Sequence, residues 1–166
     1  SFERTRIKEM AYMYPKYKPV TGQEPKDYFR DLIEAGLKKK YKQETPEIRE
    51  RIEYEIETIS RLGYVEYYLI VWDYINAARE RGISVGPGRG SGVGFILLYI
   101  LGITQINPLA ETVQTFSFRF LNPSRVSVLD IDTDIEGGRR ADVLNTFRKV
   151  YGQDRVANVA TFRTEK

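Results

Sequence analysis

Cysteine and histidine are both absent from the 166 residues of this chain. Their absence excludes disulfides, zinc sites, thiol nucleophiles, histidine general bases and serine–histidine triads. A bound metal would therefore be an oxygen-liganded one such as Mg²⁺, Mn²⁺ or Ca²⁺. Long apolar runs are missing too, because the longest, Val93 to Ile103, is too short to span a bilayer. No secretory signal opens the chain, so we expect a cytoplasmic protein with no membrane partner.

The composition fits one compact domain. Of the residues, 42% are hydrophobic and 13% are aromatic, which is enough for one core in a chain of this length. The net charge is only +3, and the isoelectric point is about 9.0. Basic residues are concentrated in residues 137–166, which hold seven Lys or Arg against three Asp or Glu. This surplus permits a polyanionic partner but does not demand one, because basic surfaces are often only solvated.

Residues 1–20 are rich in Pro, Tyr and Lys, which predicts an extended arm or linker ahead of one domain over residues 21–166. In that domain, the helical spacing of apolar residues predicts helices over 25–37, 46–62, 66–81, 93–101 and 137–152. Short extended patterns predict strands over 83–85, 116–121, 126–135 and 155–162. Helices first and strands afterwards favour an α+β fold with N-terminal helices.

Three aspartates alternate with other residues at the end of the predicted strand over 126–135. Side chains two apart share one face of a strand, so Asp130, Asp132 and Asp134 face the same way, with neighbours about 6.6 Å apart along the backbone. Two such charges at about 5 Å repel by roughly 3 kcal/mol at an effective dielectric of about 20. A divalent cation is the simplest group that offsets this repulsion, which points to two-metal chemistry on phosphates.

The aspartate trio has two other interpretations. An EF-hand calcium loop is excluded, because it needs Gly at its sixth position and Glu at its twelfth, where Ile135 and Ala141 stand. A solvent-facing edge strand is not excluded, since its acids can pair with Arg125 or Arg139. The trio alone therefore leaves a metal site and a solvated edge strand both open.

A glycine-rich segment, Gly86-Pro87-Gly88-Arg89-Gly90-Ser91-Gly92, connects a predicted strand to an apolar helix. Such a turn presents backbone N–H groups and the positive end of a helix dipole, which suits a phosphate. The spacing fits neither the Rossmann fingerprint nor the Walker motif, in which Lys rather than Gly precedes the Ser. Arg89 can bind a phosphate through two parallel hydrogen bonds. A tight turn that only lets the helix pack closely on the sheet stays open as well.

Taken together, a phosphate-binding turn and paired carboxylates predict nucleotidyl transfer, in which metals activate a 3′-hydroxyl and stabilise the leaving pyrophosphate. Arg119 and Arg125 precede the acidic strand and are candidates for neutralising phosphate charge. For each of them, the alternative is a salt bridge to the aspartate trio. Tyr64, Tyr67 and Tyr68 can stack on bases, but their helical spacing favours core packing.

Six segments follow one another along the chain: GYVEYYLIVWDYI, VGPGRGSGVG, LGITQINPL, RFLNPSRVS, DIDTD and GGRRADVLNTFRKVYGQDRVANVATF. In this order they resemble the palm of the bacterial C-family replicative DNA polymerases, the alpha subunit of DNA polymerase III. The similarity covers about residues 19–164, and the ordered set is far more specific than any single motif. It implies a palm of the polymerase beta-like nucleotidyltransferase type, with a mixed sheet backed by helices.

The resemblance also implies roles for individual residues. Asp130 and Asp132 match the catalytic metal ligands of a two-metal site for Mg²⁺, with Mn²⁺ as a substitute, and Asp134 is an accessory neighbour. The residues implied to bind the incoming nucleotide are Arg89, Gly90, Ser91, Arg119 and Arg125.

Several positions depart from the family pattern. Phe118 stands where the family usually has Glu, Val128-Leu129 replaces Met-Pro, and Arg163 replaces the Gly that follows Thr-Phe. Phe95 stands where a small polar residue is common. The family's third catalytic Asp lies after an inserted thumb, and no acid within residues 137–166 stands in a position to replace it. The resemblance therefore implies the first segment of a palm, truncated before the thumb insertion.

The resulting prediction is a fragment of a DNA-templated DNA polymerase of DNA replication, which we expect to be inactive in isolation. Its partners are dNTP, primer–template DNA and the remaining thumb and fingers domains, with a sliding clamp and a proofreading exonuclease only in the full-length context. Two alternatives stay open. One is a stand-alone, non-catalytic nucleotide- or nucleic-acid-binding module with a palm shape. The other is a self-contained nucleotidyltransferase that uses Asp134 or another acid as its third ligand.

Overall fold

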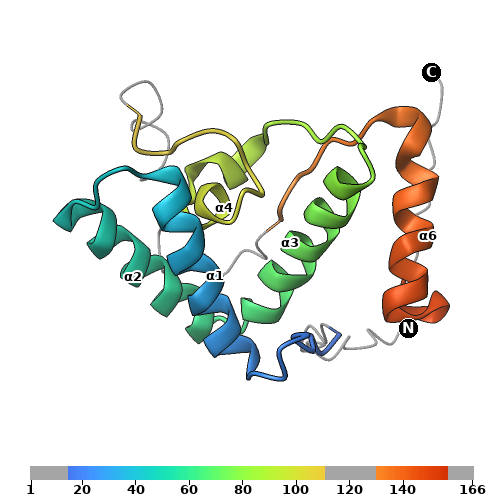
Figure 1. The fold of residues 1–166 in the computed structure, drawn as a ribbon, viewed down its shortest axis with the longest axis horizontal. Coiled ribbons are helices and arrows are strands. Elements are labelled where there is room, and N and C mark those ends of the chain that lie inside the picture. Colours follow the sequence, from blue (N-terminus) through green and yellow to red (C-terminus); the bar gives the residue numbers. More distant parts are fainter. Residues whose placement is uncertain (1–14, 111–129, 157–166) are drawn as a thin grey trace, which may run out of the picture.

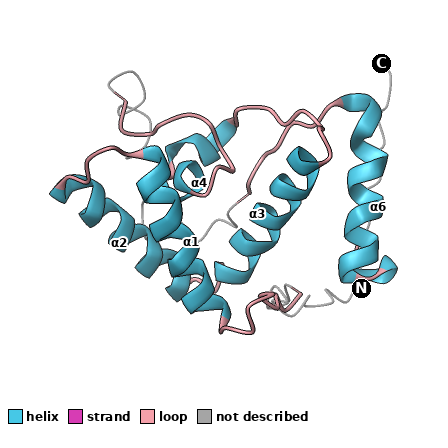
Figure 2. Ribbon diagram, viewed as in Figure 1, coloured by secondary structure: helices cyan, strands magenta, loops and turns pink. Residues whose placement is uncertain are grey.

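The fold is built from helices. The structure is a computed structural model that describes residues 15–110 and 130–156. Its helices are α1 (Pro25–Lys40), α2 (Pro46–Arg61), α3 (Val65–Glu80), α4 (Ile96–Ile100) and α6 (Arg140–Tyr151), which Figures 1 and 2 show. Short 3-10 turns cover Gly90–Gly94, Gly137–Arg139 and Gln153–Arg155.

The first three helices begin and end at signals that are visible in the sequence. Both α1 and α2 start with a proline, which a first turn tolerates because the N–H it lacks would have no intrahelical acceptor. The Thr45 hydroxyl caps α2 by accepting a hydrogen bond from the Ile48 N–H at 3.3 Å. α3 is followed by Gly82, whose φ of +67° suits a residue without a side chain. The three helices predicted in the first half of the chain are therefore confirmed.

One hydrophobic core lies among the first four helices. α1 packs against α3 and α4, and α4 also packs against α2. Each large apolar side chain that is fully buried contributes about 1.5–3 kcal/mol by leaving water. Apolar side chains that are less than 2% exposed include Phe29, Ile33, Ile52, Leu69, Ile75, Ile96, Leu97, Leu98 and Ile103. The core thus fixes α4, which is only five residues long, by packing it against α1 and α2.

α6 packs on α3, so that α3 lies between α1 and α6 (Figure 1). The rings of Tyr74 and Phe147 meet edge to face with their centres 5.0 Å apart. The Tyr151 hydroxyl donates to the Asp73 carboxylate at 2.9 Å. Val143 is buried with Ala78 and Ile83 in a second, smaller apolar cluster. These contacts hold the second described stretch of the chain against the first.

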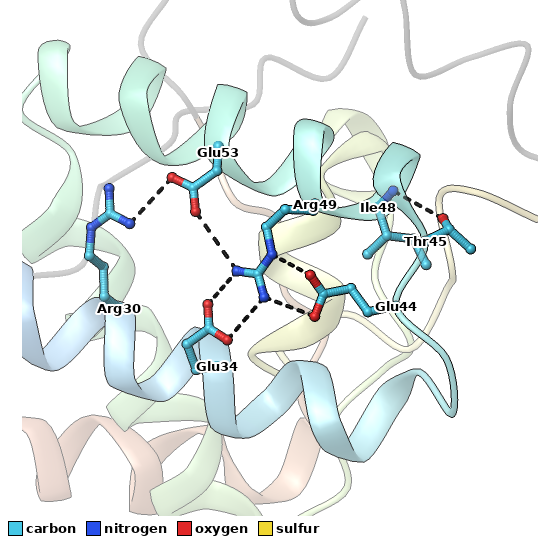
Figure 3. A network of polar contacts seen from close by, with 7 residues as sticks. All are labelled: Arg30, Glu34, Glu44, Thr45, Ile48, Arg49 and Glu53. Atoms are coloured by element: carbon cyan, nitrogen blue, oxygen red, sulfur yellow. Dashed lines mark hydrogen bonds and ion pairs between the residues drawn. The ribbon is translucent and has the colours of Figure 1, made fainter.

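Figure 3 shows how ion pairs join α1 to α2. The Arg49 guanidinium on α2 donates to Glu34 on α1 and to Glu44 before α2, with its Nη2 at 3.2 Å and 2.9 Å from their Oε2 atoms. Arg30 and Glu53 form a further pair at 3.3 Å. Hydrogen bonding to Arg49 lowers the pKa of Glu34. All these side chains are at least one-third exposed, so water screens each pair and its contribution to stability is small.

The predicted α+β fold, a polymerase beta-like palm with a mixed sheet, is wrong for the described residues. Within 15–110 and 130–156 there is no strand, and the only β-type pairing is one antiparallel bridge between Val85 and Ile135. The strand predicted over 83–85 and the described end of the one predicted over 126–135 are extended segments that meet at this bridge. The start of the strand predicted over 155–162 lies in the last 3-10 turn.

The sheet does not form because backbone groups find other partners. Beyond the bridge the Gly86 N–H still donates to the Asp134 carbonyl, but Gly88, whose φ is +107°, turns the chain out of the extended conformation, so the ladder ends there. In the other segment, the Ile131 N–H donates to the Tyr67 hydroxyl of α3 at 3.2 Å. The alternating pattern around the aspartates therefore reflects an extended segment lying on a helix, and pairing with a neighbouring strand is replaced by side-chain hydrogen bonding.

The other predicted elements differ in outcome. The helix expected over 93–101 is shorter, because a 3-10 turn occupies Gly90–Gly94 and α4 begins only at Ile96. The helix expected over 137–152 is confirmed as a 3-10 turn followed by α6. The strand predicted over 116–121 and most of the one over 155–162 lie outside the described residues.

The described part of the predicted arm packs on the helices. Tyr17 is buried, and its ring stacks on Tyr28 of α1 with the centres 6.2 Å apart. Burial, and to a lesser degree the charge of Asp73, raises the pKa of Tyr17. Across residues 15–110 and 130–156, no helix combines the length and apolar character that crossing a membrane requires.

Candidate functional site

Two segments that are far apart in the sequence lie side by side: the glycine turn (residues 86–92) and the acid segment (residues 130–135). The bridge between Val85 and Ile135 joins them. Beside that bridge, the Gly86 N–H donates to the Asp134 carbonyl at 2.9 Å. In Figure 1 the two loops meet near the end of α3. The tertiary structure therefore brings together the two motifs on which the nucleotide-binding prediction depends.

Arg89 links the two segments through its side chain. Its Nη1 lies 3.3 Å from Asp132 Oδ2, and its Nε lies 3.1 Å from Asp134 Oδ1. The Arg89 side chain is 55% exposed, while the carboxylates are 36% and 62% exposed. Because these pairs are open to water, each contributes at most about 1 kcal/mol. The guanidinium can therefore exchange a carboxylate for an incoming phosphate at little cost.

Two glycines are required where the turn meets its neighbours. Gly90 has a φ of +64°, and a Cβ on it would lie 2.9 Å from Asp132 Oδ2. Gly88 has a φ of +107°, and a Cβ there would lie 2.7 Å from the methyl carbon of Thr104. Any other residue would be strained at both positions and would push the acid segment or the loop after α4 away. The close approach of the two segments thus depends on these glycines.

Two tyrosines of α3 support the acid segment from behind. The Tyr67 hydroxyl accepts the Ile131 N–H, and the Tyr74 hydroxyl is hydrogen-bonded to Thr133. Burial, and then the charges of Asp130 and Asp132, raises the pKa of Tyr67, so its hydroxyl stays protonated at neutral pH. The sequence favoured core packing for Tyr67 and did not identify this role. The sequence did contain a signal for it, because Tyr67 and Tyr74 are seven residues apart and so lie on one side of α3.

A buried carboxylate fixes the start of α4, the helix that follows the glycine turn. Glu55 of α2 is fully buried and accepts hydrogen bonds from the N–H groups of Ile96 and Leu97, both at 3.1 Å. Arg51 donates to Glu55 at 2.8 Å and to the Gly94 carbonyl at 3.1 Å. Burial raises the pKa of Glu55, while Arg51 and the two N–H groups act in the opposite direction. These contacts tie α2 to the start of α4.

The Glu55 contacts change the role expected for the helix behind the turn. The sequence predicted that the positive end of a helix dipole would face a phosphate, but Glu55 already binds the first N–H groups of α4. A phosphate at the glycine turn is therefore left with the turn's own backbone and with Arg89. The available signal was a Glu placed within the apolar stripe that Ile52, Ile56 and Ile59 form on α2.

Asp130 and Asp132 form a donor set that fits a hard divalent cation. Asp130 is exposed and Asp132 partly so, and both carboxylates lie near enough to Tyr67 to act on its hydroxyl. Among the described residues, no three metal-ligating side chains gather closely enough to hold an ion by themselves. Mg²⁺ needs no such cage, because it commonly uses one or two carboxylates together with water and substrate phosphates. Asp130 and Asp132 therefore stay the predicted ligands for Mg²⁺ or Mn²⁺ beside a bound triphosphate.

The other predicted site residues are placed as follows. Ser91 lies partly buried in the 3-10 turn over Gly90–Gly94. Asp134 contacts Arg89 through its side chain and the glycine turn through its backbone, and its accessory role stays a prediction. Arg119 and Arg125 lie outside the described residues, so their proximity to the acid segment stays a prediction.

The sequence matches a known family over most of its length. The model of the bacterial DNA polymerase III alpha NTPase domain matches residues 27–166. The chain therefore belongs to this family, and the glycine turn and the acid segment both lie inside the matched range. The match supports the resemblance at the level of the polymerase family without specifying the palm.

Individual relatives agree with the family match. The chain is 43% identical over 151 residues to a protein of Halalkalibacterium halodurans named DNA polymerase III subunit alpha. The aligned residues make up 90% of the chain and 13% of that relative. A protein of the same name in Aquifex aeolicus is 41% identical over 161 residues, which are 94% of the chain and 14% of that relative. Another in Deinococcus radiodurans is 48% identical over 114 residues, which are 69% of the chain and 8% of that relative. The chain thus spans only a small part of the length of these relatives.

Proposed function

We propose that this chain is the part of a DNA-templated DNA polymerase that holds the incoming dNTP and its metal ions during nucleotidyl transfer to a primer 3′-hydroxyl. The observation that carries the proposal is the contact between the glycine turn and the acid segment through Arg89. The relatives named DNA polymerase III subunit alpha support it. In the polymerases that the chain resembles, this part is the first segment of the palm. The word palm here denotes the catalytic region of the polymerase and does not imply a mixed sheet.

Each residue then has a defined task. Asp130 and Asp132 hold Mg²⁺, which when bound supplies positive charge for activating a hydroxyl and for stabilising pyrophosphate as it leaves. Gly90, which has no side chain, and Ser91 present backbone N–H groups to the triphosphate. Arg89 binds a phosphate oxygen pair in place of the carboxylates that it now contacts.

The proposal also assigns what must come from elsewhere. A third carboxylate, the thumb and the fingers are expected from other parts of a longer polypeptide, since the chain covers 13% or 14% of its first relatives. We accordingly expect primer–template DNA as a partner, and a sliding clamp and a proofreading exonuclease only in the full-length context. Templated incorporation of dNTP by the 166 residues alone would contradict this division of tasks.

Calorimetric titration of the chain with dNTP in the presence and absence of Mg²⁺ tests the site. We expect Mg²⁺-dependent binding that is lost in the Asp130→Asn and Asp132→Asn variants, because the amide keeps the shape but removes the charge that the metal requires. Asp142→Asn is the matched control, since Asp142 is an exposed carboxylate on α6 that pairs with Arg139. Binding that survives in both site variants would overturn the metal assignment.

The same variants distinguish the proposed function from the alternative of a non-catalytic binding module. A non-catalytic nucleic-acid-binding module would bind DNA in a salt-sensitive manner that ignores both aspartate substitutions. The observation that favours this alternative is the surplus of four basic residues within 137–166. Measuring DNA binding and Mg²⁺·dNTP binding on one set of proteins therefore distinguishes the two functions.

A further inference from the structure

One tyrosine hydroxyl of α3 contacts the backbone between the two aspartates to which we assign the metal. The Tyr67 hydroxyl accepts a hydrogen bond from the Ile131 N–H at 3.2 Å, and Ile131 stands between Asp130 and Asp132 in the chain. Burial, and then the charges of both aspartates, raises the pKa of this hydroxyl, so both carboxylates lie near it. Tyr67 is therefore close to both predicted metal ligands without being one of them.

Ile131 is held on two sides. Its side chain is buried in the main hydrophobic core, and its N–H is bonded to Tyr67. The residues before and after it differ, because Asp130 is exposed and Asp132 is partly exposed. Successive side chains of an extended segment point to opposite sides. Fixing Ile131 therefore also directs both carboxylates away from the core.

The contact with Tyr67 supplies what a neighbouring strand would supply in a sheet. The rest of the acid segment is held after Asp132, where the Tyr74 hydroxyl is hydrogen-bonded to Thr133 and Ile135 forms the β-bridge. Of these contacts, only the bond to Tyr67 lies between the two predicted ligands. The orientation of one aspartate relative to the other thus depends on this hydroxyl.

The Tyr67 ring is itself packed against its neighbours on α3. Its centre lies 6.3 Å from that of Tyr64 and 6.5 Å from that of Tyr68, and both contacts are edge to face. Tyr68 is fully buried, so this side of the ring rests on the core. The hydroxyl is therefore held at a fixed place by the helix that carries it.

We propose that Tyr67 is a positioning residue of the metal site, whose hydroxyl holds Asp130 and Asp132 in the arrangement that Mg²⁺ requires. Mg²⁺ demands near-ideal octahedral geometry with ligands at about 2.0–2.1 Å, whereas Ca²⁺ accepts longer distances and flexible geometry. A contact that fixes the two ligands therefore favours Mg²⁺ over Ca²⁺. The presence of a metal rests on the proposed function, and the positioning by Tyr67 is the additional claim.

The test compares the affinities of the chain for Mg²⁺·dATP and for Ca²⁺·dATP, measured by calorimetry. Tyr67→Phe keeps the ring and removes only the hydroxyl. We expect its affinity for Mg²⁺·dATP to fall about tenfold, the lower end of the effect of groups that orient metal ligands. The affinity for Ca²⁺·dATP should fall by less than about threefold, because Ca²⁺ tolerates displaced ligands. A general loosening of the fold would instead weaken both metals equally.

Tyr68→Phe is the matched control. It removes the same atom from the next residue of the same helix, and no group in the described part of the chain bonds to the Tyr68 hydroxyl. Both affinities of this variant should equal those of the wild type. Urea denaturation of each variant shows that the proteins compared are folded.

A measurement on the wild type does not depend on the folding of a variant. Hydrogen exchange at the Ile131 N–H, followed by NMR, should be at least about tenfold slower than in an unstructured peptide, because this N–H is bonded to Tyr67. It should stay slow when Mg²⁺·dATP is bound. Exchange at the rate of an unstructured peptide would contradict the role of Tyr67.

Three results with the variants would overturn the proposal: an unchanged Mg²⁺·dATP affinity in Tyr67→Phe, an equal loss in Tyr68→Phe, or equal losses for the two metals. Failure of the proposed function is read separately, from Mg²⁺·dATP binding that persists in Asp130→Asn and Asp132→Asn. If these two variants lose binding while Tyr67→Phe keeps it, the metal site stands and only the role of Tyr67 is wrong. A wild type that does not bind Mg²⁺·dATP would overturn both.

Discussion

Arg89 Nη1 lies 3.3 Å from Asp132 Oδ2, across a separation of 43 residues in the sequence. The contact joins the cation of the glycine turn to a carboxylate of the proposed metal site. A phosphate and a metal ion bound here would compete with this ion pair, each taking one of its members. Under the proposed function, we therefore expect this pair to separate when Mg²⁺·dNTP binds.

Replacing Arg89 by alanine separates binding from stability. We expect dNTP affinity in the presence of Mg²⁺ to fall about tenfold or more, since a hydrogen bond to a charged group contributes about 1.5–3 kcal/mol. The free energy of unfolding should change by less than about 0.5 kcal/mol because the ion pairs are exposed. Calorimetry and urea denaturation measure the two quantities. Arg61→Ala, at an exposed arginine that ends α2, should change neither.

The Glu55→Ala substitution should destabilise the fold by about 3–5 kcal/mol, measured by urea denaturation. It would leave Arg51, which is only 15% exposed, without its carboxylate and would free two N–H groups at the start of α4. Glu57→Ala on the exposed side of the same helix is the control, with a change within about 0.5 kcal/mol. Similar losses in the two variants would contradict the role given to Glu55.

A substitution at Gly36 tests the crossing of α1 and α4. A Cβ at this position would overlap the Ile100 carbonyl oxygen. We expect Gly36→Ala to destabilise the protein by about 1–3 kcal/mol by overpacking, although alanine favours an isolated helix by up to about 1 kcal/mol. Gly138→Ala is the control, because a Cβ there meets nothing within 4 Å. A higher melting temperature for Gly36→Ala would show that the helices do not cross so closely.

Tyr68 makes stability depend on alkaline pH. Burial raises the pKa of its hydroxyl well above the ordinary value of 10.0, and the charges of Glu55 and Tyr67 add to this. Because the folded pKa is raised, the stabilisation is fully present below about pH 10 and is lost as the pH rises further. In Tyr68→Phe the free energy of unfolding should fall less steeply above pH 10, by the contribution of one ionising group. Urea denaturation between pH 7 and 11 measures this slope.

The same variant has an expected effect at neutral pH. The Tyr68 hydroxyl is buried, and no group in the described residues accepts or donates to it. Phenylalanine removes this unsatisfied group. The free energy of unfolding of Tyr68→Phe at pH 7 should therefore equal that of the wild type or exceed it by up to about 1 kcal/mol. A loss of stability at pH 7, with an unchanged pH dependence above pH 10, would be the opposite result.

Local sequence signals were sufficient for the helices. Pro25, Thr45 and Gly82 mark helix ends by chemistry that acts within one turn, so no distant contact is needed to predict them. The strand predictions that fall within the described residues failed for the converse reason. A strand exists only if another segment accepts its hydrogen bonds, and the Ile131 N–H is taken by the Tyr67 hydroxyl instead. Period-two alternation reports an extended backbone but says nothing about its partner.

The sequence by itself determined the helices, the chemical types of the site residues and the absence of any thiol or imidazole chemistry. Only the tertiary structure decided that Arg89 contacts Asp132 and that Glu55 binds the start of α4. It also decided that the Tyr67 hydroxyl accepts the Ile131 N–H. The physical reason is range: capping and periodicity act over a few residues, whereas these contacts form only after burial of the core has fixed the distances between segments.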